Sequence, residues 1–153
     1  MDDRLYRDAL GRFATGVTVV TTEYNHHIMA MTVNAFMSVS LSPKLIAISI
    51  DQKARMYHPL QQTGQFGISI LTEDQELHSR HFAKQLKDEQ LISFKMLKGV
   101  PILEDSLASL ACRVTEKVKA GDHLLFIAEV SDFNVSNGEP IIFYGGKYRK
   151  IET

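Results

Sequence analysis

The sequence has one cysteine, no tryptophan and only four prolines in 153 residues. The single thiol, Cys112, can form neither an internal disulfide nor a cysteine-based metal site, which predicts a protein of the reducing cytoplasm. Cys112 falls on the apolar face of its predicted strand, so we expect a buried, inert thiol. The sequence also has no large excess of either charge, since it contains 17 Lys+Arg and 18 Asp+Glu. This balance excludes the basic patch typical of nucleic-acid-binding domains.

Long apolar runs and glycine-rich nucleotide loops are missing too. No stretch approaches the roughly 18 apolar residues that a membrane helix requires, and the acidic residues 1–4 do not resemble an export signal. Neither a G-x-G-x-x-G turn nor a Walker A loop occurs. We therefore expect one cytoplasmic domain over residues 1–153, with no membrane or nucleic-acid partner and no Rossmann-type nucleotide fold.

Three segments have the apolar spacing of helices. They cover residues 5–13, 52–64 and 73–82, and the last begins with a capping-box pattern formed by Thr72 and Gln75. Residues 84–98 are charged and irregular, which predicts a surface excursion.

Most of the remaining sequence is β-like. β-branched runs and alternating apolar residues predict strands over residues 17–22, 28–33, 45–50, 66–71, 110–118, 123–133, 141–144 and 147–150. Short strands at this spacing with few helices predict a mainly β protein, built as an antiparallel barrel or sandwich.

Residues 32–43 form the most unusual segment of the chain. Five small hydroxyl or amide side chains lie here among apolar ones. Such groups could hydrogen-bond a polar planar ligand in an apolar cleft. The alternative is an edge strand with a solvated face followed by a Ser-Pro turn, and the pattern alone favours this alternative.

Histidines and one pair of cations are the other candidates. His123, after a tight turn, could serve as acid, base or hydrogen-bond donor, although a merely exposed turn histidine is the simpler interpretation. Lys53 and Arg55 could hold a phosphate at a helix start, or be a plain exposed pair. His78 and His81 have the i, i+3 spacing of metal ligands, but without further ligands nearby a solvated helix face is favoured over a metal site.

Five blocks spread over nearly the whole chain carry a family pattern. They are GRFATGVTVVT at 11–21, MTVNAFMSVSLSP at 31–43, GISIL at 67–71, RHFA at 80–83 and GDHLLFIAEV at 121–130. In this order they resemble the flavin reductase family, the short NAD(P)H:flavin oxidoreductases that supply reduced flavin to two-component monooxygenases. The resemblance implies an FMN-binding split β-barrel, generally a homodimer, that takes FMN or FAD and uses NADH or NADPH as electron donor.

The resemblance also implies which residues meet the cofactors. Those along the ribityl chain and phosphate would be Thr32, Val33, Asn34 and Ala35, and those along the isoalloxazine ring Ser38, Val39 and Ser40. Those on the phosphate side would be Ser49, Ile50, Asp51 and Lys53, with Phe82 packed near the flavin. His123 would face the nicotinamide as a positioning group, with Tyr148 near the same pocket.

The chain departs from the family pattern in the phosphate loop. Residues 53–56 are KARM, where the family has a Ser/Thr-rich loop, and we hypothesise that Lys53 and Arg55 bind the phosphate by charge instead. The implied reaction is hydride transfer from the nicotinamide to flavin N5, with Ser and backbone donors around residues 38–40 supporting the reduced ring. A flavin-binding electron carrier with tightly held FMN, and a non-catalytic split-barrel binding module, remain as alternatives.

Overall fold

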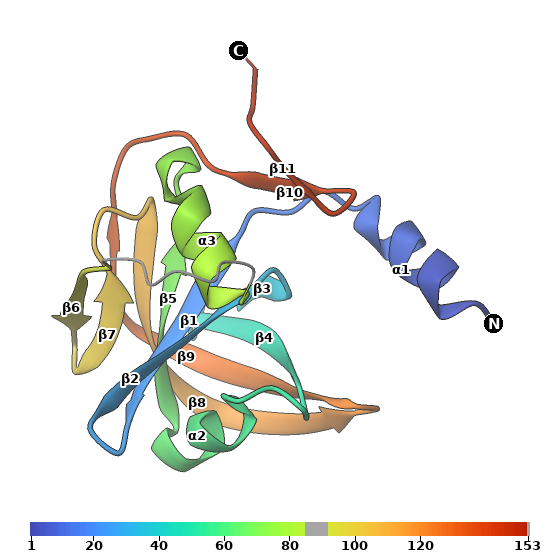
Figure 1. The fold of residues 1–153 in the computed structure, drawn as a ribbon. Coiled ribbons are helices and arrows are strands. Elements are labelled where there is room, and N and C mark those ends of the chain that lie inside the picture. Colours follow the sequence, from blue (N-terminus) through green and yellow to red (C-terminus); the bar gives the residue numbers. More distant parts are fainter. Residues whose placement is uncertain (85–91, 153) are drawn as a thin grey trace.

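One curled antiparallel sheet forms the body of the protein (Figure 1). The structure is a computed structural model and describes residues 1–84 and 92–152. Seven strands lie in the order β2-β1-β5-β8-β9-β4-β3, and every neighbouring pair is antiparallel. Their bounds are β1 Thr18–Tyr24, β2 His27–Val33, β3 Phe36–Ser40, β4 Leu45–Asp51, β5 Gln65–Ile70, β8 Ala108–Ala120 and β9 His123–Val135. The prediction of a mainly β, antiparallel protein is confirmed.

Two small hairpins complete the β structure. One pairs β6 Phe94–Leu97 with β7 Val100–Leu103, and the other pairs β10 Ile142–Tyr144 with β11 Lys147–Arg149. The predicted irregular excursion over 84–98 is therefore wrong from Phe94 onward, and residues 85–91 lie outside the described residues. A four-residue strand with only its two ends half-buried has too little alternation to be recognised in the sequence.

All three predicted helices are present, with shifted starts. They are α1 Asp3–Gly11, α2 Tyr57–Thr63 and α3 Glu76–Phe82, the last preceded by the 3-10 turn η1 Glu73–Gln75. The Thr72–Gln75 capping box is confirmed. The helix predicted over 52–64 begins only at Tyr57, because the Asp51 carboxylate accepts the Lys53 N–H at 2.9 Å and holds residues 51–54 in a turn. None of the helices in the described ranges is both long and apolar enough to cross a membrane.

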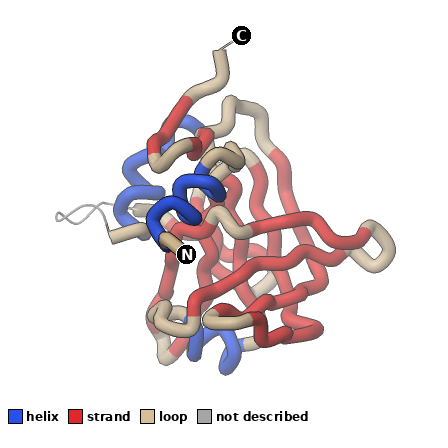
Figure 2. The backbone as a smooth tube through the Cα atoms, turned by 90° about the vertical axis from the view of Figure 1, so that its right-hand side faces the viewer, coloured by secondary structure: helices blue, strands red, loops and turns tan. Residues whose placement is uncertain are grey.

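The two edge strands of the seven-stranded sheet are neighbours in sequence. β2 ends at Val33 and β3 begins at Phe36, so Asn34 and Ala35 alone connect one edge to the other. Such a link spans only about 10 Å even when extended, so the sheet must curl until its edges approach. In Figure 2 the strands form this curled layer with the helices outside it. The edges do not pair with each other, so the sheet stays open between β2 and β3.

The core lies inside the curl and in a second layer outside it. Phe66 and Phe126 are fully buried in the inner cluster, where Cys112 also lies. Burial raises the pKa of the Cys112 thiol to about 12, which agrees with the expected inert thiol. The outer cluster includes Leu71 and Ile141 and is flanked by side chains of α3 and of the β10–β11 hairpin.

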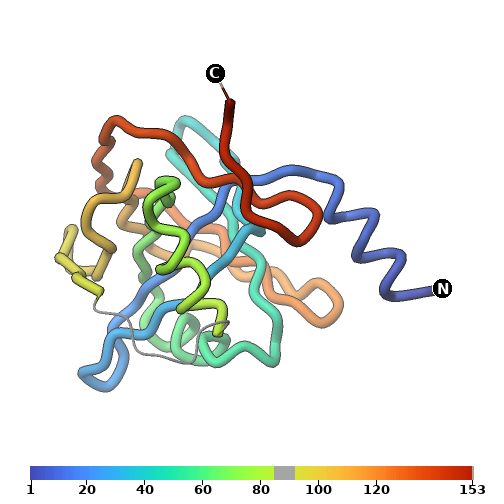
Figure 3. The backbone as a smooth tube through the Cα atoms, turned by 45° about the horizontal axis from the view of Figure 1, so that its top comes forward, coloured from blue at the N-terminus to red at the C-terminus, as the bar shows by residue number. Residues whose placement is uncertain are grey.

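Helix α1 extends away from this body (Figures 1 and 3). Its N-terminus is capped by Asp2, whose Oδ1 accepts the N–H of Arg4 at 2.9 Å. None of its residues is buried. The apolar stripe that predicted the helix is thus left uncovered within the chain, and it comprises Leu5, Tyr6, Leu10 and, just beyond the helix, Phe13.

Candidate functional site

One cavity borders the Asn34–Ala35 link, and another lies beside the preceding strand β2. The first cavity has a volume of about 610 Å³ and is walled by Asn34, Ala35 and Ser49 on one side and by residues 13–18 on the other. Its lining is mostly apolar, with a few polar groups among the aliphatic ones, which is typical of sites for planar organic ligands. The first cavity therefore borders the link that joins the two edge strands of the sheet.

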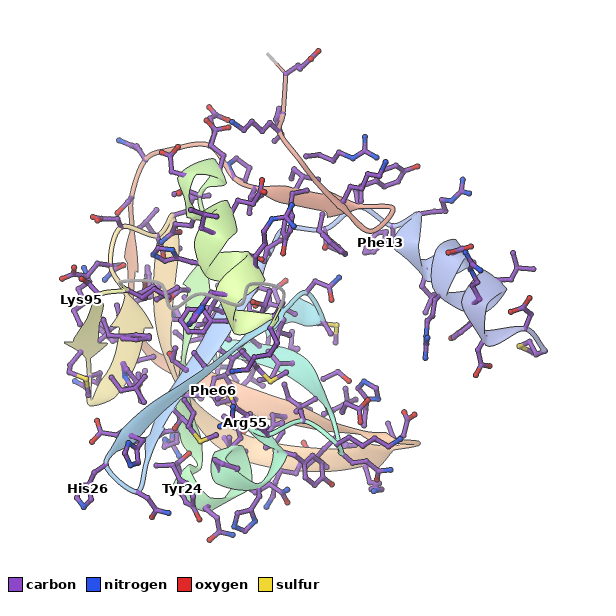
Figure 4. The ribbon with its side chains drawn as sticks, viewed as in Figure 1. Phe13, Tyr24, His26, Arg55, Phe66 and Lys95 are labelled. Carbon is purple, nitrogen blue, oxygen red and sulfur yellow. The ribbon has the colours of Figure 1, made fainter. Side chains whose placement is uncertain are left out.

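The second cavity has a volume of about 830 Å³ and lies beside β2. It is lined by Thr32 of β2, by Arg55 from the turn before α2, and by His81 and Phe82 at the end of α3. Figure 4 shows Arg55 well separated from Phe13, which lines the first cavity. Arg55 is exposed and lines this cavity as a cation.

The strand pair β4–β9 continues the first cavity toward His123. Ser49 stands opposite Leu125, and both line the first cavity. Two residues further along the ladder, Asp51 stands opposite His123. Cross-strand partners share a face and residues two apart on a strand do so as well, so His123 lies on the same outer face as this cavity wall. The intervening Ile50 points the other way and is 1% exposed in the core.

Asp122 fixes the His123 ring. The Nδ1 atom of His123 lies 2.8 Å from Oδ1 of Asp122, and this hydrogen bond, followed by the charge of His123, lowers the pKa of Asp122. An ionised carboxylate only accepts, so it assigns the proton of a neutral ring to Nδ1 and leaves Nε2 as an acceptor. The ring remains 40% exposed. The Gln52 N–H donates to the Asp122 carbonyl at 2.9 Å, which ties the hairpin tip to the end of β4.

Lys53 and Arg55 point to different places. The charge of Lys53 acts on Asp122, at the hairpin tip, whereas Arg55 lines the second cavity. Because α2 starts at Tyr57 with Met56 as its N-cap, neither cation stands at a helix N-terminus. The expectation of a phosphate site at a helix start is therefore wrong in its placement, although Arg55 keeps a position from which it could meet an anion.

Thr32, Ser79 and Tyr148 form a chain of hydrogen bonds across three elements. Thr32 Oγ1 donates to the Ser79 carbonyl at 2.6 Å, and Ser79 Oγ lies 2.6 Å from the Tyr148 hydroxyl. The guanidinium of Arg80 lies 4.7 Å from the centre of the Tyr148 ring. Tyr148 is thereby held against α3. The structure does not bring it together with His123 within one chain, because the β8–β9 tip and the β10–β11 hairpin lie at different ends of the molecule (Figure 1).

The other residues that the family resemblance assigns to flavin binding lie partly on the edge strand β3 and partly in the core. Val33 is 6% exposed in the core, so only its backbone faces the link. Ser38 and Val39 lie exposed on β3, and Ser40 is half-buried at its end. The edge-strand interpretation of this segment is confirmed, because β3 is the outermost strand and residues 41–44 form a turn. Thr32 lines the second cavity, and the residues of this segment that line the first cavity are Asn34, Ala35, Phe36 and Met37.

Two features of the site were not predicted from the sequence. Thr15, in the first of the five sequence blocks, lines the first cavity, and its buried Oγ1 has no hydrogen-bond partner. His78 and His81 are half-buried with unpartnered Nδ1 atoms, so the favoured solvated helix face is wrong. Burial and then the charge of His81 lower the pKa of His78. No cluster of three possible metal ligands occurs among residues 1–84 and 92–152.

The chain matches known proteins over almost its whole length. Residues 10–152 match the family model "Flavin reductase like domain". An NADH-dependent flavin reductase of a Rhodococcus species is 45% identical over 95% of this chain and 85% of its own length. The reductase component of 4-hydroxyphenylacetate 3-monooxygenase from Thermus thermophilus is 34% identical over 95% of both chains. The solved structure of the flavin reductase PheA2 in its native state is 48% identical, covers 100% of both chains and superposes with a TM-score of 0.98. The chain belongs to the flavin reductase-like family, as its five sequence blocks predicted.

Proposed function

We propose that this protein is an NADH-dependent flavin reductase that transfers a hydride to FMN or FAD and supplies the reduced flavin to a monooxygenase component. The observation that carries the proposal is the shared outer face of β4 and β9, which joins His123 to the wall of the first cavity. A nicotinamide at His123 and a flavin ring in this cavity would therefore lie along one surface. The activity and partners named for the relatives support the same conclusion.

The flavin would lie along the Asn34–Ala35 link. Its ring would take the first cavity, whose mostly apolar lining suits a flat aromatic ring. Its phosphate end would point to Arg55 in the second cavity. When bound, the flavin supplies the hydride-accepting centre.

The side chains around the two cavities would have different roles in binding the flavin and the nicotinamide. Thr32 gives its only hydroxyl proton to the Ser79 carbonyl, so toward the flavin it can only accept, which suits a ribityl hydroxyl. Phe82 would provide an apolar wall. Ser38 and Ser40 would reach the ring from the edge strand. His123, with Nε2 free as an acceptor, would orient the nicotinamide carboxamide, whose N–H groups donate.

The protein is proposed to be one split-barrel domain that works as a homodimer in the cytoplasm. The open gap between β2 and β3 supports the split barrel. The exposed stripe of α1 supports the dimer, because about 55–79% of each of its four apolar side chains is exposed in the single chain. Phe13 both belongs to this stripe and lines the first cavity, so a second copy would also cover the site.

Steady-state NADH oxidation with and without added flavin tests this function. We expect turnover that requires free FMN or FAD. A yellow protein that retains its flavin and shows no turnover with NADH would instead identify an electron carrier. A colourless protein without flavin affinity would leave only a binding module. Anaerobic titration with each nicotinamide and each flavin, followed at the oxidised-flavin absorbance, would name the preferred pair.

A further inference from the structure

The second cavity follows the free edge of β2. Side chains alternate between the two faces of a strand, so a cavity on one face meets only every second residue. This cavity is lined by every residue from His27 to Thr32. It therefore runs along the edge of the strand itself, over about 17 Å at the rise of an extended chain.

The backbone of this edge has unused hydrogen-bonding groups. Tyr24 and His27 flank the two-residue turn of the β1–β2 hairpin and form its first hydrogen-bonded pair. Because hydrogen-bonded and non-hydrogen-bonded pairs alternate in an antiparallel ladder, the N–H and C=O groups of Ile28, Ala30 and Thr32 point away from β1. β2 is the outermost strand, and within the described ranges no other backbone group pairs with these three residues. The edge thus offers both donors and acceptors to a ligand in the cavity.

The charges and rings of the cavity wall favour an anion that carries a flat group. Arg55 and Lys84 are exposed cations on this wall, and none of the described residues that line it is Asp or Glu. The half-buried Tyr24 lies at the hairpin end of the wall (Figure 4), and Phe82 adds a second ring from α3.

The ribityl phosphate of FMN would fill only part of this cavity. A flavin ring in the first cavity places the ribityl chain at the Asn34–Ala35 link and at Thr32, the near end of the β2 edge. From there, five carbons and one phosphate span about 9 Å at ordinary bond lengths, so they do not reach Tyr24 at the far end. FAD continues beyond this phosphate with a second phosphate, a ribose and an adenine. These groups match the cations, the strand edge and the aromatic ring of the wall.

We propose that the second cavity binds the ADP half of FAD, with the adenine stacked on Tyr24, and that the protein therefore prefers FAD to FMN. This rests on the proposed function, in which the flavin phosphate points to Arg55. Adenine carries an N–H donor beside a ring-nitrogen acceptor, and a free C=O and N–H of the β2 edge can pair with both. NADH has the same ADP group, but its nicotinamide is placed at His123, which does not line this cavity.

Flavin titrations in the absence of nicotinamide test the proposal with Tyr24→Leu and its matched control Tyr24→Phe. The wild type should bind FAD at least about tenfold more tightly than FMN, as expected for one stacked base. Tyr24→Leu should raise the Kd for FAD about tenfold and leave the Kd for FMN within about twofold, which also shows that the fold is intact. Tyr24→Phe keeps the ring and should behave as the wild type. The KM for NADH, measured with FMN, should be unchanged in both variants.

Three results would overturn the proposal while leaving the flavin reductase function intact. These are equal affinity of the wild type for FAD and FMN, an unchanged Kd for FAD in Tyr24→Leu, or an equal loss of affinity for both flavins in that variant. An unchanged Kd for FAD together with a higher KM for NADH would assign the cavity to the ADP group of the nicotinamide nucleotide. By contrast, a wild-type protein that does not oxidise NADH with either flavin would refute the proposed function itself.

Discussion

His123 stands directly opposite Asp51 across the β4–β9 ladder, and its ring is hydrogen-bonded to the neighbouring Asp122. The pairing brings together two residues that are far apart in the sequence, at the end of the wall of the first cavity. Because of this pairing, His123 lies on the same outer face of β4 and β9 as the wall of the first cavity, and a flat ligand could bind along that face.

Replacement of His123 by Ala should weaken nicotinamide binding selectively. We expect the KM for NADH to rise about tenfold, as for the loss of one well-placed hydrogen bond, and the flavin Kd to change less than about twofold. Steady-state kinetics and flavin fluorescence titration measure the two quantities. His58→Ala, at an exposed position of α2, is the control. Loss of flavin binding in His123→Ala would show that this assignment is wrong.

Replacement of Arg55 and replacement of Lys53 should have different effects on flavin affinity. Arg55→Ala should raise the flavin Kd about five- to tenfold and reduce its salt dependence, because Arg55 lines the second cavity. Lys53→Ala should have a smaller effect, since Lys53 acts on Asp122 at the hairpin tip. Flavin titrations at low and high salt compare them. Equal flavin affinity and salt dependence in wild type and Arg55→Ala would rule out this phosphate site.

Acid should destabilise the fold through His78. Its pKa is lowered by burial and by His81, so the folded protein binds fewer protons at this site than the unfolded chain. The contribution of neutral His78 to stability is therefore complete above the ordinary pKa of 6.5 and is lost as the pH falls below it. Denaturant midpoints at pH 7.5 and 5.5 should differ less for His78→Gln than for wild type. An identical difference in both proteins would contradict the prediction.

Gly67 should tolerate no side chain. A Cβ on this residue of β5 would overlap the Pro101 carbonyl of β7 and lie 2.7 Å from Thr21 Oγ1. Gly67→Ala should lower the free energy of unfolding by about 3 kcal/mol, because two strands must move apart. Gly16→Ala, where a Cβ meets nothing within 4 Å, should change it by less than about 0.5 kcal/mol. Urea unfolding of both variants compares these values.

Two charges on the apolar stripe of α1 should dissociate the proposed dimer. Leu5→Asp with Leu10→Asp would place carboxylates in an interface that has to exclude water, and we expect a monomer by light scattering. Asp8→Asn, on the same helix, is the control and should leave the dimer intact. A wild-type protein that is already monomeric at micromolar concentration would refute this arrangement.

Much of the fold could be predicted because local periodicity decides it. Strands such as β1 and β9 carry alternating or β-branched residues, and the capping box at Thr72 marks its helix. What could not be predicted depends on contacts between distant segments. The early turn before α2 comes from one Asp51 side chain, and the burial of His78 comes from packing that no local pattern records.

The candidate site, too, could be predicted from the sequence only in part. The polar segment containing Asn34 and Ala35 stands out by composition, and family resemblance adds His123. The role of Thr15 and the bond between Ser79 and Tyr148 depend on a C-terminal hairpin that folds back over the start of the chain. Nothing near Ser79 in the sequence distinguishes it from an ordinary helix residue.

The order of the sheet also bears on how the chain is made. β4 pairs on one side with β3 and on the other with β9, so its apolar run from Leu45 to Ile50 stays half-unpaired until the last third of the chain has been synthesised. An exposed apolar strand edge invites pairing with another nascent chain. Folding on the ribosome should therefore be slow to complete, and overproduction at high temperature should favour aggregates seeded by β4.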